Sequence, residues 1–310
     1  MFTEILSNHG LTVTQWEKQL YEEYTGMLQW KYYMGTSNEA IIQVKEDLMK
    51  DSGDKIKFGI AGRVVGGHVT GNARLWGNEG TMEFFDDMIT VDNDRQGVKI
   101  TDVPMTQQRV LFDVLLKAKG GLKLKAREAL DDSITVALSD VTQGRVQGRY
   151  LYGASDSNYN ATHATALANV DNTADKLTAS MISMAKRKAQ IPANGATTKI
   201  RPMMVKNGKN YEEWYVLKAH SYAIRDLTEL DAVWKSGQLN LPPRDHSDSP
   251  LFTGSSFKGA WNGVLIHEYD RLLLDASTIQ VAHNLFLGAQ AGAVAWAQRS
   301  TFGEQTEDYG

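Results

Sequence analysis

Cysteine is absent from the 310 residues, so the chain can form neither a disulfide bond nor a thiolate ligand or nucleophile. The sequence also lacks the basic excess of proteins that grip nucleic acid, since 33 Lys and Arg stand against 37 Asp and Glu. No apolar run approaches the ~20 residues of a membrane helix, and the first residues lack the pattern of a secretory signal. These absences favour a protein that assembles in a reducing cytoplasm, away from membranes.

Common catalytic and metal-binding motifs are missing as well. We find neither a phosphate-binding loop nor a dinucleotide-binding glycine motif, and no two of the seven histidines lie four residues apart. His267-Glu268 lacks the second histidine of the zinc-protease motif. We therefore expect no enzymatic activity, no cofactor and no metal site.

Two short patterns are weak matches to known sites. Residues 92–97, DNDRQG, resemble the start of a calcium loop, but Gln96 and Val103 stand where ligands are needed. We interpret this segment as a solvated turn. Ser255 and Lys258 match the S-x-x-K motif of penicillin-recognising enzymes, whose two partner motifs do not occur in this sequence.

One segment, 75–97, concentrates the candidate contact residues. An acidic pair there is either a carboxylate cluster for acid–base chemistry or, as we favour, a partner for basic residues of a neighbouring chain. Aromatic residues on an extended loop need burial, and we favour docking on another subunit over folding back. The candidates for contact between subunits are Trp76, Phe84, Phe85, Asp86 and Asp87.

The hydrophobic pattern predicts a mixed helix and strand protein. Residues 55–65 alternate apolar and polar residues as a half-buried strand does, and six glycines between Gly62 and Gly80 indicate a long hairpin or extended loop. The expected return strands cover 88–91 and 97–100. Residues 106–138 repeat apolar residues at helical spacing and predict a helix of ~50 Å, kinked or split at Gly120-Gly121.

Further elements are expected along the chain. The order predicts an α+β fold, not the regular alternation of a doubly wound sheet. The expected helices cover 14–33, 39–50, 173–190, 227–235 and the small-residue segment within 277–296, and the expected strands cover 214–217, 262–267 and 271–274.

Several longer motifs in combination resemble a known family. They are GDKIKFGIAGRVVGGHVTG (53–71), LWGNEGTMEFFDDMITVD (75–92), WYVLKAHSYAIRDL (214–227), PLFTGSSF (250–257) and the segment 288–295. Together they resemble the major capsid proteins of tailed bacteriophages, in the N-four-like podophage capsid family. That family has the Hong Kong 97-type fold, with an N-terminal arm, an extended E-loop, a peripheral domain with a long spine helix, and an axial domain.

The resemblance implies a division of the chain by position. It assigns the N-terminal arm to residues 1–54, the E-loop and its base strands to 55–105, the peripheral domain with the spine helix to 106–149, the axial domain to 150–282, and a return to the peripheral domain to 283–310.

The resemblance also implies a function. The chain would be a shell subunit that assembles with itself into hexamers and pentamers of an icosahedral virion shell, made in the host bacterial cytoplasm. Implied partners are a scaffolding protein, a portal, possibly a decoration protein, and packaged double-stranded DNA enclosed without sequence-specific binding; no membrane is involved. The rival reading is a soluble hydrolase or binding module that uses the Asp86 cluster or the Ser255 and Lys258 pair.

Overall fold

The computed structural model describes residues 28–46, 55–100, 108–109, 113–139, 148–191, 199–207, 210–239, 251–252, 255–276 and 279–298. The chain divides into two compact units. We call residues 1–21, 44–99 and 295–310 the hairpin unit, and residues 22–43 and 100–294 the body. Each is described by itself. No described helix combines the length and the apolar character that crossing a membrane requires.

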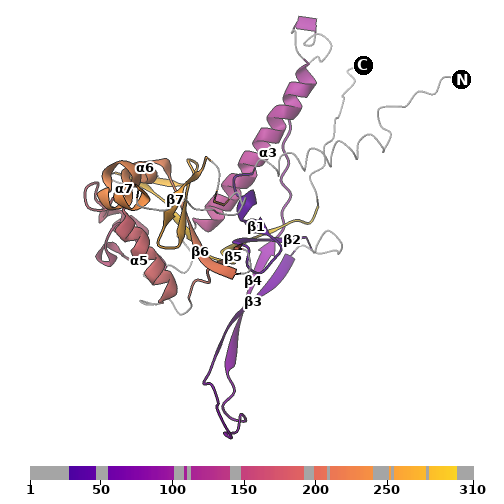
Figure 1. Cartoon of the computed structure of the whole chain (residues 1–310). Coiled ribbons are helices and arrows are strands. Elements are labelled where there is room, and N and C mark those ends of the chain that lie inside the picture. The colour runs from indigo at the N-terminus through magenta and orange to yellow at the C-terminus, as the bar shows by residue number, and fades with distance from the viewer. Residues whose placement is uncertain are drawn as a thin grey trace, which may run out of the picture. The chain divides into compact units, whose positions relative to one another are not determined.

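A five-stranded sheet forms the centre of the body (Figure 1). Its order is β11-β6-β8-β7, and β5 also pairs with β6. The β6–β8 pair is parallel, and the others are antiparallel. The strands are β5 (Met203–Asn207), β6 (Asn210–Ala219), β7 (Phe257–Trp261), β8 (Val264–Glu268) and β11 (Leu285–Leu287).

Both faces of this sheet are buried, which explains why β8 begins with three consecutive apolar residues, 264–266, and not with an alternating pattern. On one face, Val216 and Leu265 lie in a hydrophobic cluster with Trp30, Ile42 and Ile134. The other face forms a second cluster with three α-helices and a π-helical turn, and its members include Tyr215, Leu217, Val264 and Ile266. Because strand residues alternate between faces, one short strand supplies both clusters.

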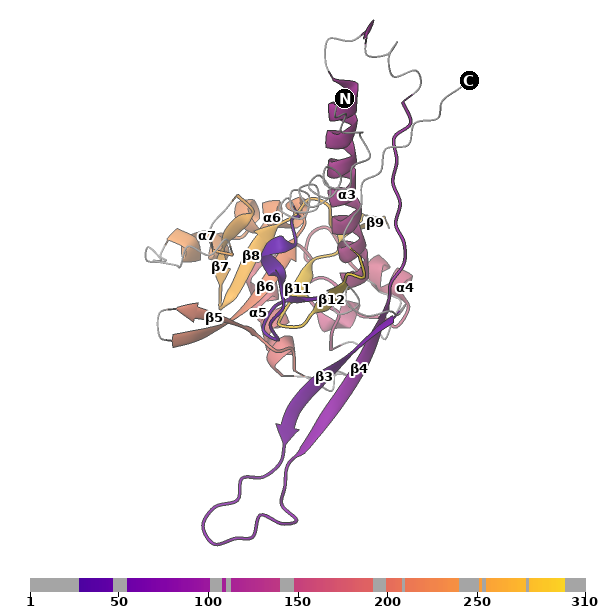
Figure 2. The ribbon, with the colours of Figure 1, turned by 90° about the vertical axis from the view of Figure 1, so that its right-hand side faces the viewer.

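The helices on the second face follow one another closely in the chain, apart from α5 (Figure 2). They are α5 (Ala179–Gln190), α6 (Ser221–Arg225), the π-helical turn η4 (Asp226–Leu230) and α7 (Ala232–Leu239). The predicted helix 173–190 thus starts later than expected, at a Thr178 cap whose side chain accepts from the Met181 amide.

The longest helix, α3 (Val114–Leu138), lies in the region of the predicted helix 106–138. A single helix from residue 106 was predicted wrongly: residues 108–109 are helical, but Asp113 has an extended backbone and caps α3 by accepting from the Leu116 amide at 3.1 Å. At 1.5 Å per residue the helix is ~38 Å long. It runs unbroken through Gly120-Gly121, and its buried residues, Asp131, Ile134 and Thr135, lie in its last turns.

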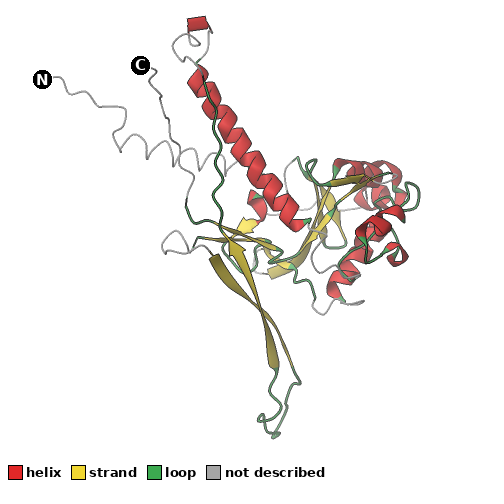
Figure 3. Ribbon diagram, turned by 180° about the vertical axis from the view of Figure 1, so that it is seen from behind, coloured by secondary structure: helices red, strands yellow, loops and turns green. Residues whose placement is uncertain are grey.

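The hairpin unit contains a long two-stranded antiparallel ribbon, β3 (Lys55–Val65) and β4 (Thr81–Thr90), joined by the loop 66–80 (Figure 3). The predicted strand 55–65 and the glycine-rich connection are therefore confirmed. The predicted return strands are wrong in extent, since β4 begins at Thr81 and residues 91–100 form no strand. Gly66 is required at the neck, because a Cβ there would lie 2.4 Å from Gly80 Cα.

Three other predictions are wrong. The predicted helix 39–50 contains β2, and the predicted helical segment 277–296 contains three short strands. The predicted pair 262–267 with 271–274 is not formed, since β8 pairs with β6 and β7. The predicted helix 14–33 lies mostly outside the described residues; its end is a 3-10 turn, η1 (Lys31–Tyr33).

The remaining strands form two small sheets, in the orders β1-β2-β12 and β10-β9. They are β1 (Met34–Gly35), β2 (Ile42–Lys45), β9 (Leu274–Ala276), β10 (Gln280–Ala282) and β12 (Gly292–Ala295). Short helices η3 (Asp156–Asn158) and α4 (His163–Ala168) precede α5, and α4 contributes to a third, small apolar cluster around Tyr152. The body is therefore an α+β fold, as predicted.

Candidate functional site

The hairpin loop presents Trp76 at the corner of a turn. The Asn78 amide donates to the Leu75 carbonyl at 2.9 Å, and Gly77 has a φ of 89°, which favours glycine at this position. The Gly77 amide donates to Glu79 Oε2 at 2.7 Å, which braces the turn. Trp76 is 87% exposed. The loop thus holds a large aromatic side chain in solvent on an ordered turn.

One face of the ribbon has a row of exposed apolar side chains. Met82, Phe84 and Met88 are alternate residues of β4, and all three are exposed, Phe84 by 74%. Val64, paired with Met82, extends the row onto β3. The four side chains are exposed by 42% for Met82 up to 74% for Phe84.

Asp86 and Asp87 are neighbours in β4, where Asp86 pairs with Gly59 and Asp87 with Phe58. The Asp86 side chain is exposed, and the side chains of Phe85 and Asp87 lie outside those that the structure describes. The five predicted contact residues remain predictions.

The two weak motifs do not form sites in the described residues. The Lys258 ammonium binds Glu268 Oε2 at 2.7 Å, which engages the lysine of the S-x-x-K pattern with a carboxylate. Glu268 has a lowered pKa, chiefly because Lys258 donates a hydrogen bond to it. Around 92–97 the described acidic residues form no group of three that could hold a metal ion.

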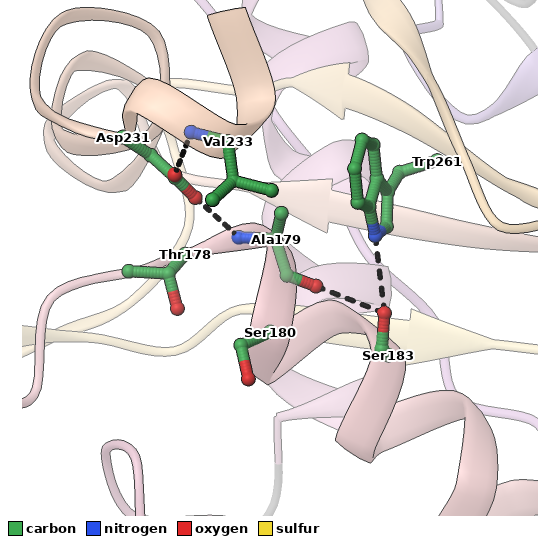
Figure 4. A pocket seen from close by; sticks show the side chains of 7 residues that line it. All are labelled: Thr178, Ala179, Ser180, Ser183, Asp231, Val233 and Trp261. Carbon is green, nitrogen blue, oxygen red and sulfur yellow. Dashed lines mark hydrogen bonds between the residues drawn. The ribbon is translucent and has the colours of Figure 1, made fainter. Parts of the chain in front are cut away.

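A shallow pocket of about 340 Å³ lies between α5 and α7 (Figure 4). Its polar groups bond to one another. Asp231 accepts from the Ala179 amide at 2.7 Å and from the Val233 amide at 2.8 Å, so one carboxylate caps both helices. Trp261 Nε1 donates to Ser183 Oγ at 3.0 Å. These bonds link α5 to α7 and to Trp261, and they occupy the carboxylate of Asp231 and the hydroxyl of Ser183.

The body also contains a buried lysine that sequence reasoning missed. Lys218 of β6 is 2% exposed, and its Nζ lies 3.4 Å from the ring centre of Trp30 and 4.1 Å from that of Tyr269. Burial lowers the pKa of Lys218 to about 7, although the charge of Asp131 opposes the shift. Burial, together with the Lys218 charge, lowers the pKa of His267 to about 4. This cation in an aromatic cage links β6 to residues 28–33 and to α3.

A second group that sequence reasoning missed is His163, Asp275 and His283. His163 Nε2 lies 2.7 Å from Asp275 Oδ2, and His283 Nε2 bonds to the same oxygen. His163 is 112 residues from Asp275, so no local sequence motif contains all three residues. Only the fold brings these side chains together.

Comparison with known proteins decides the family. The model of a family described as phage capsid protein matches residues 4–307. The chain belongs to the phage capsid protein family. Comparison with curated proteins gives no match. The fold of this phage capsid protein resembles the capsid of Ralstonia phage GP4, with a TM-score of 0.70 at 21% identity over 90% of this chain and 80% of that one.

Two further capsid structures resemble this phage capsid protein. The cyanophage Pam1 capsid matches with a TM-score of 0.60 at 28% identity, over 78% of this chain and 68% of that one. The capsid of Helicobacter pylori bacteriophage KHP30 matches with a TM-score of 0.52 at 15% identity, over 78% of this chain and 57% of that one. The predicted capsid fold is confirmed, and it is consistent with the Hong Kong 97 type. The protein is a major capsid protein with a structural role, and such a protein associates with itself into a shell.

Proposed function

We propose that the β3–β4 hairpin is the E-loop of this capsid protein and that it docks on a neighbouring copy in the shell. The observation that carries the proposal is the row of exposed apolar side chains on an ordered ribbon, with Trp76 at its tip. Large exposed apolar surfaces are typical of interaction sites, and tryptophan often dominates binding energy. Asp86 and Asp87 would meet basic residues of the neighbour and set the register of the contact.

Within this proposal, copies form hexamers and pentamers through head-to-tail contacts that close into rings. The shell encloses packaged double-stranded DNA without gripping it, which agrees with the net charge of −4. The further partners are a scaffolding protein, a portal and possibly a decoration protein. The shell assembles in the bacterial cytoplasm and becomes the capsid of the virion. In this proposal the chain carries out no catalysis. Its division into arm, E-loop, peripheral domain, axial domain and return segment is the one that the sequence resemblance implies.

Assembly of purified protein, followed by electron microscopy and sedimentation, tests the docking. Trp76→Ala and Phe84→Ser each remove a largely exposed side chain, 87% for Trp76 and 74% for Phe84, so folding should be unchanged while shell yield falls at least ~10-fold. Trp76→Phe keeps an aromatic ring and should retain much of the yield. His68→Ala, an exposed polar position in the same loop, is the matched control.

The rival function predicts another result. A soluble hydrolase or binding module would give small discrete particles at every concentration, with or without a scaffolding protein. Regular shells from both Trp76→Ala and Phe84→Ser at the unaltered yield would overturn the docking role of the hairpin and leave the capsid assignment untouched.

A further inference from the structure

We propose that His163, Asp275 and His283 form a binding site for a divalent transition-metal ion, with zinc the ion that fits best. Each residue offers one ligand atom, and the three atoms lie within 4.8 Å of one another. This proposal revises the expectation of no metal site, and it is independent of how the hairpin acts.

The fold places two of the ligands by local geometry. Asp275 of β9 pairs with Val281 of β10, and the His283 amide donates to the Leu273 carbonyl at 2.9 Å. His283 therefore lies two residues beyond the partner of Asp275, on the same face of this hairpin, where side chains on a diagonal meet.

The third ligand comes from α4, where His163 is the first helical residue. Val281 packs against the small apolar cluster that contains Tyr152 and Leu167. This contact holds the β9–β10 hairpin beside α4, so the ligand from a distant part of the sequence is positioned by apolar packing and not by the metal alone.

A further contact orients His163 as in many metal sites. The Tyr152 hydroxyl lies 2.8 Å from His163 Nδ1 and is itself largely buried. When the imidazole carries its hydrogen on Nδ1, that hydrogen is donated to the tyrosine oxygen, and the lone pair of Nε2 points to the ion. Hydrogen bonds of this kind fix the tautomer and the ring orientation of metal-binding histidines.

The donor set selects the class of ion. Two imidazole nitrogens and one carboxylate oxygen suit zinc, which also leaves a position for water. Calcium and magnesium prefer oxygen ligands alone, so they fit poorly. The side chains are partly open to solvent, with 24% of His163, 31% of Asp275 and 12% of His283 exposed, so an ion has access.

Such an ion would fasten the β9–β10 sheet, which has no hydrogen-bonded neighbour among the described strands, to α4. An ion that binds only the folded state raises the free energy of unfolding, and the increase grows with the logarithm of the ratio of the free ion concentration to Kd. Bound zinc would therefore strengthen a peripheral part of the body that the central sheet does not hold.

Zinc titration of the untagged, unassembled chain, freed of metal by chelation, tests the site. Competition with a chromophoric chelator should find about one ion per chain with a micromolar or tighter Kd, and zinc should raise the Tm while magnesium does not. His163→Gln, Asp275→Asn and His283→Gln should each weaken binding at least ~10-fold, and Tyr152→Phe by ~10–100-fold. The control, His68→Gln, removes an exposed histidine of the hairpin loop and should change nothing.

Two outcomes would overturn the proposal. One is a zinc affinity for His283→Gln or Tyr152→Phe equal to that of the unaltered chain. The other is an unaltered chain whose Tm does not respond to zinc, which would leave the three residues as a hydrogen-bonded cluster only. The Tm measurement uses the unaltered chain, so misfolding of a variant cannot affect it.

Discussion

The charge of Lys218 should make the stability of the folded chain depend on pH. This lysine is buried against Trp30, Tyr33 and Tyr269, and burial lowers its pKa to about 7. In the unfolded chain a lysine has a pKa of about 10.4. Between these values the unfolded chain holds a proton that the folded chain has lost, so the free energy of unfolding rises with pH.

The size of the rise follows from the linkage relation. One proton difference changes the free energy of unfolding by ~1.4 kcal/mol per pH unit, or roughly 3 kcal/mol between pH 7 and pH 9.5. The aromatic cage works against this, because a desolvated ammonium over an aromatic face gains ~0.5–2 kcal/mol. The cage favours the charged form and so reduces the expected rise to roughly 1–2.5 kcal/mol.

Urea unfolding of the unassembled chain at several pH values measures this effect. Lys218→Met is the comparison variant, since methionine keeps most of the apolar stem and has no charge, and its stability should be nearly flat from pH 7 to 9.5. The range ends there because burial raises the pKa of Tyr269 to about 12, and also raises that of Tyr33. Above pH 10 the tyrosines ionise in the unfolded chain first, and stability falls.

The decisive quantity is the difference in the free energy of unfolding between the unaltered protein and Lys218→Met, because other titrating groups affect both proteins alike. An equal rise in the unaltered chain and in Lys218→Met would refute the assignment of the pH dependence to Lys218. A fall in stability over this range in the unaltered chain would refute the depressed pKa itself.

Two other predictions concern stability. Gly66→Ala places a Cβ 2.4 Å from Gly80 Cα, so it should destabilise the hairpin neck by ~1–3 kcal/mol and speed proteolysis of the loop 66–80, whereas Gly67→Ala, with nothing within 4 Å of its Cβ, should not. Asp231→Ala removes the cap of α7 and the acceptor of the first amide of α5, whose own cap, Thr178, remains; at ~0.5–2 kcal/mol per capping interaction it should cost ~1–4 kcal/mol in urea unfolding. Asp226→Ala serves as its control, and equal losses in the two variants would contradict the capping role.

The hairpin was predictable because its signals are local. The alternation of Ile56, Phe58 and Ile60 with polar residues defines a strand, and the glycines that follow prevent a packed core. The helical spacing after residue 110 likewise predicted α3. What failed was the start of α3, since Asp113 acts as the cap and no proline or glycine marks that point.

The small-residue segment near the end of the chain shows why other predictions failed. The alanines and glycines of 288–295 predict close packing within a helix. In the structure, a Cβ on Gly288 would lie 2.3 Å from the Arg201 carbonyl oxygen, and Gln290 has a φ of 60°. Gly288 allows two backbone segments to approach closely. This requirement comes from a tertiary contact, so the local sequence does not indicate it.

The groups of chemical interest in the body were beyond sequence reasoning for a similar reason. Lys218 contacts Trp30, which is far away in the chain, and an isolated lysine in a strand pattern reads as a solvent-facing residue. His163 and Asp275 meet only because α4 and the β9–β10 hairpin share an apolar cluster. Such groups depend on packing between elements that the sequence pattern leaves unpaired.

Energetics also constrain how the proposed hairpin docking can operate. Among the hairpin side chains that the structure describes, the large exposed apolar ones are Val64, Leu75, Trp76, Met82, Phe84 and Met88. Full burial of such a side chain yields ~1.5–3 kcal/mol, and since several are already partly covered, the set gives roughly 10 kcal/mol. Loss of translational and rotational freedom costs ~4–15 kcal/mol, so one docked hairpin gains little by itself. In a closed ring each copy gives one hairpin and receives another, and the last contact joins copies already in place. Docking through this ribbon therefore favours complete rings over dimers.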